Sequence, residues 1–541
     1  MQPVLNVEDI RAVEARLARE GVSVAELMYR AGNAVAQEVL GLEDTHSVTI
    51  LAGVGNNGGD GWVAAEALRR EGVVVAVVTP CPISELKSDL VRVIAGKAEE
   101  AGAHVFVGPS RLEIEQLVAS SDVVVDAILG TGFHGKLSNP FDIWVDVLNQ
   151  SGVPVVAVDV PSGLSAQTGL AAGNFVRADV TVTMLALKPG LLADQGRDAC
   201  GAIVVAPLAN QTEQLVIDAD PVAWRNEVTD YVEVLDEPTA AVDKYSRGSV
   251  LVVGGSYLFP GAAIMAAKAA ARAGAGYVTL AVPDVVAATA QAHLLDIPVV
   301  GLPSEKDGTF AESASKTIRQ LAERRDATLV GPGMLVTSST VGVVSSLLDA
   351  ACPLVLDADG INCLARLTSD NIEDFPEVVR REYPLILTPH RRELGRLVGL
   401  KDNPPESLTS ALNIARRVVW SNGGRECVVV AKGTATACVS VDVALLPKPG
   451  PAALATAGSG DVLAGIMAAR LSHGVDDIQS LPLLAAQACE IHGMAGSMAQ
   501  ERYGTTGVVA SDLIDLIGLA ADDLSDRALY ADYPDAAQDE E

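Results

Sequence analysis

Residues 48–80 read VTILAGVGNNGGDGWVAAEALRREGVVVAVVTP, and this stretch decides the fold of the first half of the chain. A short apolar run leads into a glycine-rich loop, an amphipathic segment and a second apolar run. That order predicts a βαβ unit with parallel strands. Further apolar runs at 123–129, 153–160, 180–185 and 203–205 alternate with helical patterns. The first half is therefore predicted to be a Rossmann-like, doubly wound α/β domain.

The second half begins a new series of strands and helices with different motifs. An Ala-rich helix is expected at 261–273. Strands are expected at 327–330, 353–356, 384–387, 427–430 and 435–439. The alternation of strand and helix patterns stops between 209 and 240, where acids and prolines cluster. We therefore expect a domain at 1–222, a linker at 223–238, an α/β/α domain at 239–525 and an acidic tail at 526–541.

Composition restricts the class of protein. The chain has 541 residues, 49% of them hydrophobic, and a formal net charge of −30. Such a charge disfavours nucleic acid and anionic lipid as partners. The seven cysteines are widely spaced without a CxxC motif, which is typical of reduced cytoplasmic thiols. The N-terminus lacks a signal-peptide pattern, and no apolar run reaches the ~18–20 residues of a membrane span.

The glycine loop GVGNNGGDG (53–61) lies between a predicted strand and helix. It contains GxGxxG, but the second strand ends in Val78-Thr79-Pro80 without an acid for a ribose hydroxyl, so a plain dehydrogenase is disfavoured. Glycine-loop amides at a helix start favour phosphate. Three other loops (126–132, 159–163 and 188–190) also follow strand ends and should line the same ligand crevice.

Polar side chains in these loops suggest two kinds of chemistry. Asn57, Asp126 and Ser162 supply oxygen atoms of the kind that hard cations prefer. Asp159 can serve as an acid or a base.

Three motifs in this half, GVGNNGGDG, VVDAILGTG (124–132) and VDVPSGL (158–164), resemble in order those of NAD(P)H-hydrate epimerases. The resemblance implies that Asp159 contacts the reacting ring and that Asn57, Asp126 and Ser162 hold a potassium ion. It also implies that the hydrate is bound by Asn56, Asn57, Gly58, Gly59, Asp60, Gly130, Thr131, Gly132, Phe133, His134, Gly135 and Lys136.

In the second half, the loop AGSGD (457–461) precedes an apolar helix. Glycines at a helix start let several amides point at one anion, and the following Asp461 can accept a proton from a hydroxyl that attacks a phosphoryl group. This GxGD arrangement resembles the ribokinase-like superfamily. Residues 431–436 are predicted to form a strand-turn-strand segment suited to a nucleotide, in which Lys432 can steady phosphate charge.

Seven further segments resemble NAD(P)H-hydrate dehydratases, at 244–248, 253–256, 261–263, 274–276, 331–333, 357–362 and 387–390. The resemblance implies that the hydrate is contacted by Ala263, Gly333, His390 and Asp461. It further implies that ADP, with Mg²⁺, is held by Lys432, Gly433, Thr434, Ala435, Thr436 and Gly460.

The two resemblances together predict a cytoplasmic cofactor-repair enzyme. It would epimerise the R and S forms of hydrated NADH and NADPH and dehydrate the S form at the expense of ADP. Its partners would be these small molecules, and we expect a homo-oligomer. One alternative is a ribokinase-like, vitamin-type kinase fused to a non-catalytic nucleotide-binding module. In a second alternative, the first half is a ligand-binding or scaffolding domain without catalytic activity.

Several of these residues also have purely structural interpretations. Aspartates such as Asp126 and Asp159 at strand ends are often turn or capping residues. His390 can be a helix cap, Lys432 a solvated surface lysine, and Asp461 a cap of its own helix.

Overall fold

The computed structural model describes residues 1–235, 247–369, 382–400, 403–421, 426–474 and 480–531. The chain forms two compact units. The first consists of Gln2–Ala223 with Ser407–Thr409, and the second of Trp224–Glu406 and Ser410–Glu541 with Met1.

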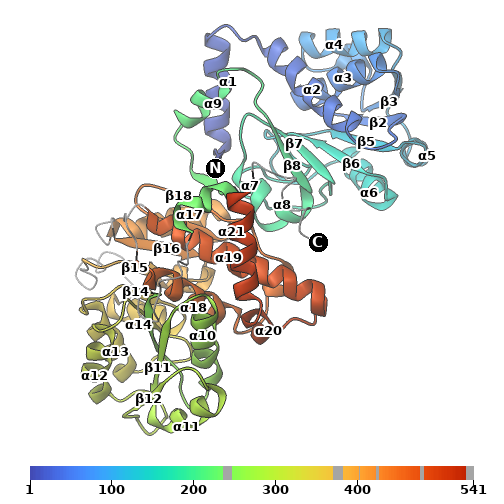
Figure 1. The fold of residues 1–541 in the computed structure, drawn as a ribbon. Helices are drawn as coiled ribbons and strands as arrows, with labels where there is room; N and C mark the ends of the chain where they lie inside the picture. The colour runs from blue at the N-terminus through green and yellow to red at the C-terminus, as the bar shows by residue number, and fades with distance from the viewer. Residues whose placement is uncertain (236–246, 370–381, 401–402, 422–425, 475–479, 532–541) are drawn as a thin grey trace. The chain divides into compact units, whose positions relative to one another are not determined.

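The first unit is built on a parallel sheet with strand order β4-β3-β2-β5-β6-β7-β8 (Figure 1). The strands are β2 (Ser47–Ala52), β3 (Val74–Thr79), β4 (His104–Val107), β5 (Val123–Ala127), β6 (Val155–Val158), β7 (Val180–Met184) and β8 (Ala202–Ala206). The order reverses between β2 and β5, as in doubly wound folds, so the predicted Rossmann-like sheet is confirmed.

Helices cover both faces of this sheet because successive strand residues point to opposite sides. Ile50 and Val125 pack in the core beneath α1 (Val7–Arg19), α2 (Val24–Leu40), α3 (Asn56–Arg70) and α4 (Asp89–Glu100). Their neighbours Leu51 and Val124 pack in a second core beneath α5 (Arg111–Ala119) and α6 (Phe141–Ser151). The unit also contains β1 (Gln2–Val4), η1 (Ile83–Glu85), α7 (Pro189–Leu192), α8 (Asp194–Ala199) and α9 (Thr212–Ile217).

The second unit has a larger mixed sheet, whose strands run in the order β9-β18-β17-β16-β15-β14-β13-β10-β11-β12. The stretch from β16 to β12 is parallel, whereas β17 is antiparallel to both of its neighbours. The strands are β9 (Ala223–Arg225), β10 (Ser249–Val253), β11 (Tyr277–Pro283), β12 (Val299–Leu302), β13 (Ala327–Val330), β14 (Leu354–Leu356), β15 (Leu385–Leu387), β16 (Cys427–Ala431), β17 (Ala437–Val439) and β18 (Ala444–Leu446).

Helices again lie on both faces of the sheet, which confirms the α/β/α expectation (Figure 1). One core packs α10 (Pro260–Arg272), α11 (Asp284–His293), α18 (Ser459–Ser472), α19 (Leu481–Tyr503), α20 (Ala510–Ile514) and α21 (Ile517–Leu529). Along the other face run α12 (Ser315–Ala322), α13 (Ser338–Leu348) and α14 (Asp359–Leu367), and α16 (Arg391–Leu397) packs against α14. The remaining elements are α17 (Leu408–Ser421), η2 (Val228–Val234), η3 (Glu312–Ala314) and η5 (Ala452–Leu454).

Part of the expected linker is folded into the second unit. Strand β9 pairs in parallel with β18, and Asn226 N donates to Leu446 O at 2.9 Å. Tyr231 in η2 is buried, and its hydroxyl donates to Glu490 at 3.3 Å. Strand β9 was not predicted, because it has only three residues and lies in a segment where acids and prolines cluster. Residues 236–238 of the linker and 532–541 of the tail lie outside the described residues.

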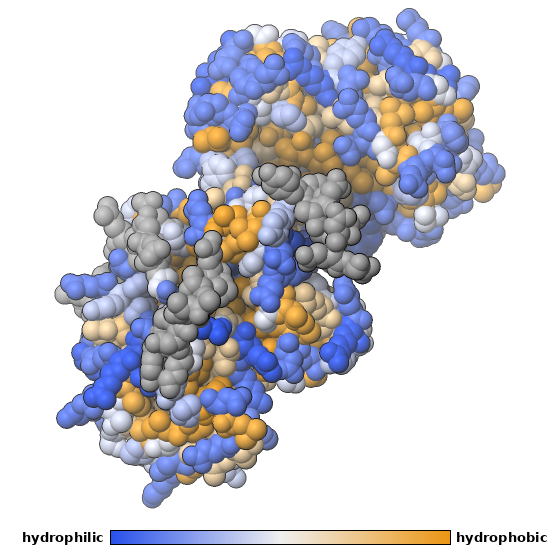
Figure 2. Space-filling model, viewed as in Figure 1, coloured by the Kyte–Doolittle hydropathy of each residue, from blue (hydrophilic) through white to orange (hydrophobic). Residues whose placement is uncertain are grey.

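The surface agrees with the acidic composition. Figure 2 shows hydrophilic residues over much of the visible face of both units, with hydrophobic residues in smaller patches. Among the helices that the structure describes, none combines the length and apolar character needed to cross a membrane.

Candidate active sites

The first site lies where adjacent parallel strands of the first unit end. Asn57 opens α3 after β2, Asp126 is near the end of β5, and Asp159 directly follows β6. Asn57 and Asp159 converge over Gly130. A Cβ at Gly130 would lie 2.8 Å from Asn57 Oδ1 and 2.9 Å from Asp159 Oδ2. Glycine is therefore required here so that two polar side chains can meet above the loop.

Asp159 is held by a lysine to which the sequence analysis gave no role. Lys188 Nζ lies 2.8 Å from Asp159 Oδ1, and the Lys188 side chain has no exposed surface. The other oxygen, Oδ2, accepts a hydrogen bond from the amide of Thr131 at 3.0 Å. Asp159 also has a positive φ of 68°. A non-glycine residue rarely adopts this conformation, and such backbones cluster at functional sites.

Two further carboxyl groups surround this ion pair. Burial, reinforced by the charges of Asp159 and Glu14, raises the pKa of Asp60 well above its usual value. The pKa of Glu14 is also raised, mainly by burial and then by Asp159, while Lys188 partly opposes the shift. The site therefore holds more carboxyl groups than cations, an arrangement that enzymes use to keep one carboxyl group protonated.

Asp126 and Ser162 form a second polar pair in the same unit. Ser162 donates its hydroxyl to Asp126 Oδ1 at 2.6 Å and its amide to Oδ2 at 2.7 Å. Ile128 N also donates to Oδ1 at 3.2 Å, as in an Asx-turn, so Asp126 has a structural role as well. Burial raises the pKa of Asp126 to about 6, although these hydrogen bonds oppose the shift.

The oxygen atoms at this pair are of the kind that ligate hard cations. Among the described residues, no cationic side chain bonds to the fully buried Asp126 carboxylate. Asn57 Nδ2 is also buried without a hydrogen-bond partner, but this N–H group is a donor and would face an oxygen atom rather than a cation. A buried carboxylate that lacks a counter-charge is unfavourable unless a cation joins it. Carboxylate, hydroxyl and amide oxygens are suitable ligands for a hard cation.

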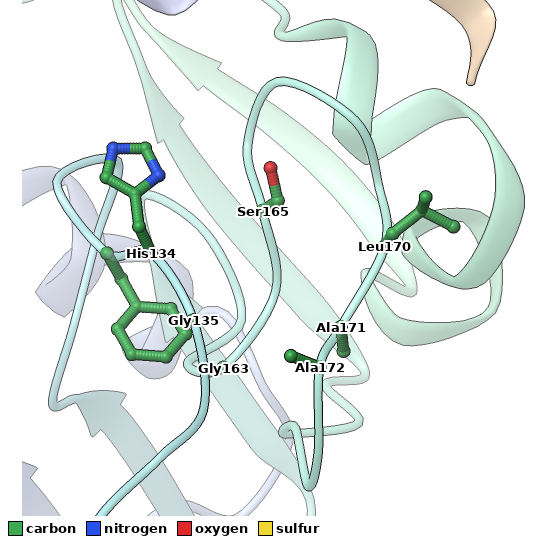
Figure 3. Close-up of a pocket in the computed structure, with 8 residues that line it drawn as sticks. His134, Gly135, Gly163, Ser165, Leu170, Ala171 and Ala172 are labelled. Atoms are coloured by element: carbon green, nitrogen blue, oxygen red, sulfur yellow. The ribbon is translucent and has the colours of Figure 1, made fainter. Parts of the chain in front are cut away.

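A cavity of about 230 Å³ lies beside the predicted hydrate loop. Phe133, His134 and Gly135 line one side, and the segment from Gly163 to Ala172 lines the other (Figure 3). Lys136 is close by, because a Cβ at Gly173 would lie 2.9 Å from Lys136 Cγ. Four residues predicted to bind the hydrate therefore lie at or beside a cavity.

The second site is formed around the loop before α18. Gly458 is the N-cap of this helix and has a φ of 92°, where a Cβ would also lie 2.6 Å from Met265 Cε. Asp461 follows inside the first turn and is not the cap, which is evidence against its purely structural interpretation. Burial, then the charges of Asp357 and Asp359, raise the pKa of Asp461 to about 7, although Lys432 opposes the shift.

Lys432 lies directly beside this loop and is not a solvated surface lysine. A Cβ at Gly460 would lie 3.3 Å from Lys432 Nζ. The ammonium bonds to Asp357 Oδ1 at 2.8 Å, and the same oxygen accepts the Thr388 hydroxyl at 2.7 Å. Burial lowers the pKa of Lys432, but the carboxylates of Asp357 and Glu393 outweigh it and the net pKa is raised.

His390 combines a structural position with exposure to the site. Its Nδ1 accepts the amides of Arg392 and Glu393 and thereby caps α16, which confirms the capping interpretation for this nitrogen. Its Nε2 lies 3.3 Å from Glu393, while half of the side chain is exposed. Burial, then Lys432 and Arg396, lower the pKa of His390. Because Nδ1 accepts these amides, a neutral imidazole carries its proton on Nε2, which can donate to Glu393 or to a ligand but cannot accept.

The remaining predicted residues of the second unit lie around the same strand ends. Gly433 to Thr436 form the turn between β16 and β17. Gly333 approaches the loop before α10, where a Cβ would lie 2.5 Å from Phe259 O. Ala263 lies within α10 and is fully buried. The motif residues 244–246 lie outside the described part of the chain.

Three functional candidates were missed at the sequence level: Lys188, Asp357 and Glu393. Lys188 follows a predicted strand in the 188–190 loop, and Asp357 follows one in the 357–362 segment. Glu393 lies beyond the 387–390 segment, inside α16, and no noted motif contained it. For Lys188 and Asp357, strand-end position was the available signal, because the carboxyl ends of parallel strands line ligand crevices.

The chain is a two-domain α/β protein with two candidate ligand sites. Each unit has a glycine loop and a lysine–aspartate ion pair at its parallel strand ends. Comparison with known proteins also divides the chain into two domains. Residues 250–518 match the family model described as NAD(P)H-hydrate dehydratase, and residues 24–190 match that of the YjeF-related protein N-terminus.

Full-length relatives identify the family. The chain is 35% identical to the bifunctional NAD(P)H-hydrate repair enzyme of Salinibacter ruber over 513 residues, covering 91% of each chain. It is 32% identical to the enzyme of that name from Coxiella burnetii, covering 91% of this chain and 94% of the relative. Among solved structures, the ADP/ATP-dependent NAD(P)H-hydrate dehydratase of Bacillus subtilis, co-crystallised with ATP and Mg²⁺, is 27% identical with a TM-score of 0.44. It covers 54% of this chain and 95% of that chain.

This chain belongs to the family of bifunctional NAD(P)H-hydrate repair enzymes. Membership across both halves does not favour the alternative of a vitamin-type kinase fused to a non-catalytic module.

Proposed function

We propose that this chain restores hydrated NADH and NADPH in two steps carried out by separate units. The first unit would interconvert the R and S hydrates, and the second would dehydrate the S form with consumption of ADP. The observation that carries this proposal is that each unit matches the corresponding family while holding its own aspartate beside a glycine loop. We propose an epimerase domain at 1–222 and a dehydratase domain at 239–525, with residues 224–235 between them packed in the second unit.

In the first unit, Asp159 would pass the proton of the C6 hydroxyl to N1 as the C6–N1 bond opens and C6 becomes an aldehyde. It would pass the proton back when N1 adds to the opposite face of C6, which inverts the configuration. Its Oδ2 lies over Gly130, and Asn57 approaches the same point, which supports a ligand atom between them. The loop from Gly130 to Lys136 would hold the hydrate beside the cavity lined by Phe133 and His134. The amides of Asn56 to Gly58, in the first turn of α3, would bind its phosphates, whereas the amide of Gly59 already donates to Gly55 O at 3.0 Å.

A potassium ion would be held by Asn57, Asp126 and Ser162. When bound, it would supply positive charge for the buried Asp126 carboxylate and for substrate phosphate.

In the second unit, Asp461 would accept the proton of the C6 hydroxyl as that oxygen attacks the β-phosphorus of ADP and AMP leaves. Phosphate would then depart from C6 with the electrons of the C–O bond, and loss of the C5 proton would restore the ring double bond. The balance is hydrate plus ADP giving the reduced cofactor, AMP and phosphate. A carboxyl group whose pKa is about 7 suits this proton transfer near neutral pH.

Other residues of the second unit would bind rather than react. Lys432, residues 433–436 and Gly460 would hold the nucleotide, and His390 and Gly333 would contact the hydrate. Ala263 is fully buried within α10 and has no surface to offer the hydrate. Mg²⁺ bound with the nucleotide would offset charge on its phosphates. We also propose a cytoplasmic, homo-oligomeric protein.

Purified R and S hydrates test this function directly. Each is incubated with the full chain and Mg–ADP, with Mg–ATP, or without nucleotide. Absorbance of the reduced nicotinamide and release of AMP and phosphate are then followed. We expect recovery from both epimers with ADP and none without nucleotide. A stable phosphorylated product, or no recovery from either epimer, would overturn the proposal.

A further inference from the structure

Lys188 is a buried cation whose hydrogen-bonding capacity is fully used. Its ammonium donates to Asp159 Oδ1 at 2.8 Å, to the Thr183 hydroxyl at 2.7 Å and to Met184 O at 3.0 Å. An ammonium has three protons, so each has one acceptor. The lysine follows β7, whereas Asp159 follows the adjacent strand β6. The ion pair therefore joins two neighbouring strand ends.

Stability alone explains this lysine poorly. A buried ion pair must overcome the loss of hydration of both charges, and apolar residues of similar volume are often equally stable in its place. The Lys188 side chain itself has no exposed surface. A role for Lys188 should therefore be sought in what it does to Asp159.

The two oxygens of Asp159 are held from different directions. Lys188 binds Oδ1, while the amide of Thr131 binds Oδ2 beside Gly130. Rotation of the carboxylate would break one contact or the other. Fixing a reacting group in this way reduces the motion needed to reach the transition state.

We propose that Lys188 is a positioning residue of the epimerase site, which holds Asp159 Oδ1 so that Oδ2 stays directed at the C6 hydroxyl of the hydrate. Lys188 contacts Asp159 and not the hydrate. The inference rests on the proposed function, because it assigns a role through Asp159.

Replacement of Lys188 by Met removes the charge and keeps a similar length. We expect kcat for epimerisation to fall about 100-fold, within the range for misplaced acid–base groups, while KM changes less than about threefold. Lys97→Met is the matched control, because Lys97 is an exposed lysine of the same unit that bonds to Tyr29. It should epimerise normally. Dehydration of the S hydrate by the same chains reports whether the rest of the protein is intact.

A double-mutant cycle separates positioning from general structure. Asp159→Asn, Lys188→Met and the double variant are compared for epimerisation. If Lys188 acts through Asp159, adding Lys188→Met to Asp159→Asn should lower kcat little further. An additive loss, or a Lys188→Met chain that epimerises like the wild type, would overturn the inference.

Thr183 gives a test that leaves the ion pair in place. Thr183→Val removes one acceptor of the ammonium, whereas Thr183→Ser keeps the hydroxyl. We expect kcat for epimerisation to fall severalfold in the first and to be restored in the second, and equal rates in both would contradict the inference. If Lys188→Met yields no folded protein, the comparison of Thr183→Val with Thr183→Ser tests the positioning role of Lys188 instead. Failure of the wild-type chain to epimerise would instead refute the proposed function.

Discussion

The two sites contain the same kinds of residue but connect them differently. In the first unit, the buried lysine bonds to the aspartate proposed to act on the hydrate, Lys188 to Asp159 at 2.8 Å. In the second, Lys432 bonds to Asp357 at the same distance and leaves Asp461 outside the ion pair. The pKa of Asp461 is raised to about 7 by burial and by Asp357.

This difference matches the chemistry proposed for each unit. Epimerisation returns every proton that it moves, so an aspartate held in an ion pair can serve as a fixed partner. Phosphoryl transfer needs a base that takes up a proton while a cation remains free to face phosphate. Pairing Lys432 with Asp357 instead of Asp461 leaves Asp461 outside the ion pair, while Lys432 Nζ still lies near Gly460 at the proposed phosphate site.

The largest effect is expected at Asp461. Replacement by Asn removes the proposed base while preserving shape, so dehydration of the S hydrate should fall about 1000-fold. Epimerisation should be unchanged, because the first unit has its own aspartate. Rates are measured by absorbance for dehydration and by chromatographic separation of the epimers for epimerisation. Dehydration at near wild-type rate would show that Asp461 is not the base.

A smaller loss is expected when Lys432 is replaced by Met. This removes the cation beside Gly460 and leaves the buried Asp357 without its partner. Dehydration should fall about 100-fold, the scale of losing one stabilising group for developing charge. Nucleotide affinity, measured by calorimetry with Mg–ADP, should weaken as well. Normal affinity together with normal turnover would remove Lys432 from the site.

The pH dependence should distinguish the second site from the first. Because Asp461 must be deprotonated to accept a proton and its pKa is about 7, kcat for dehydration should rise through neutral pH. Below that pH it should fall about tenfold per unit. Asp461→Asn should lose this dependence. A profile that is flat across neutral pH in the wild type would contradict the proposed role of the carboxyl group.

The smallest effect is expected from the proposed potassium site. Exchange of potassium for a bulky organic cation should slow epimerisation severalfold, because Asp126 then lacks a counter-charge. Asp126→Asn should be slow in both solutions and should no longer respond to potassium. If potassium changes the wild type and Asp126→Asn equally, the ion binds elsewhere.

The sequence predicted the sheets well for a physical reason. Buried parallel strands are almost continuously apolar, so runs such as 123–129 and 153–160 identify β5 and β6 near their observed bounds. Strand β9 was not predicted, because its three residues form no continuous apolar run. The strand depends instead on its pairing with β18.

The candidate sites were only partly predictable. Motifs indicated Asp159 and Asp461, since each follows or opens a recognisable loop. The ion pairs were not visible, because Lys188 and Asp159 are 29 residues apart and Lys432 and Asp357 are 75 apart. Contacts between different strand ends depend on the strand order, which the sequence does not encode locally.

The most direct test of two separate sites is the extent of repair of a mixture of R and S hydrates by Asp159→Asn. The measurement compares final absorbance with Mg–ADP in the wild type and the variant, over a period in which buffer alone does not interconvert the epimers. The wild type should restore the whole mixture. The variant should stop at the fraction that began as the S form, at an unchanged initial rate. Full repair by the variant, or loss of repair of both epimers, would contradict the account.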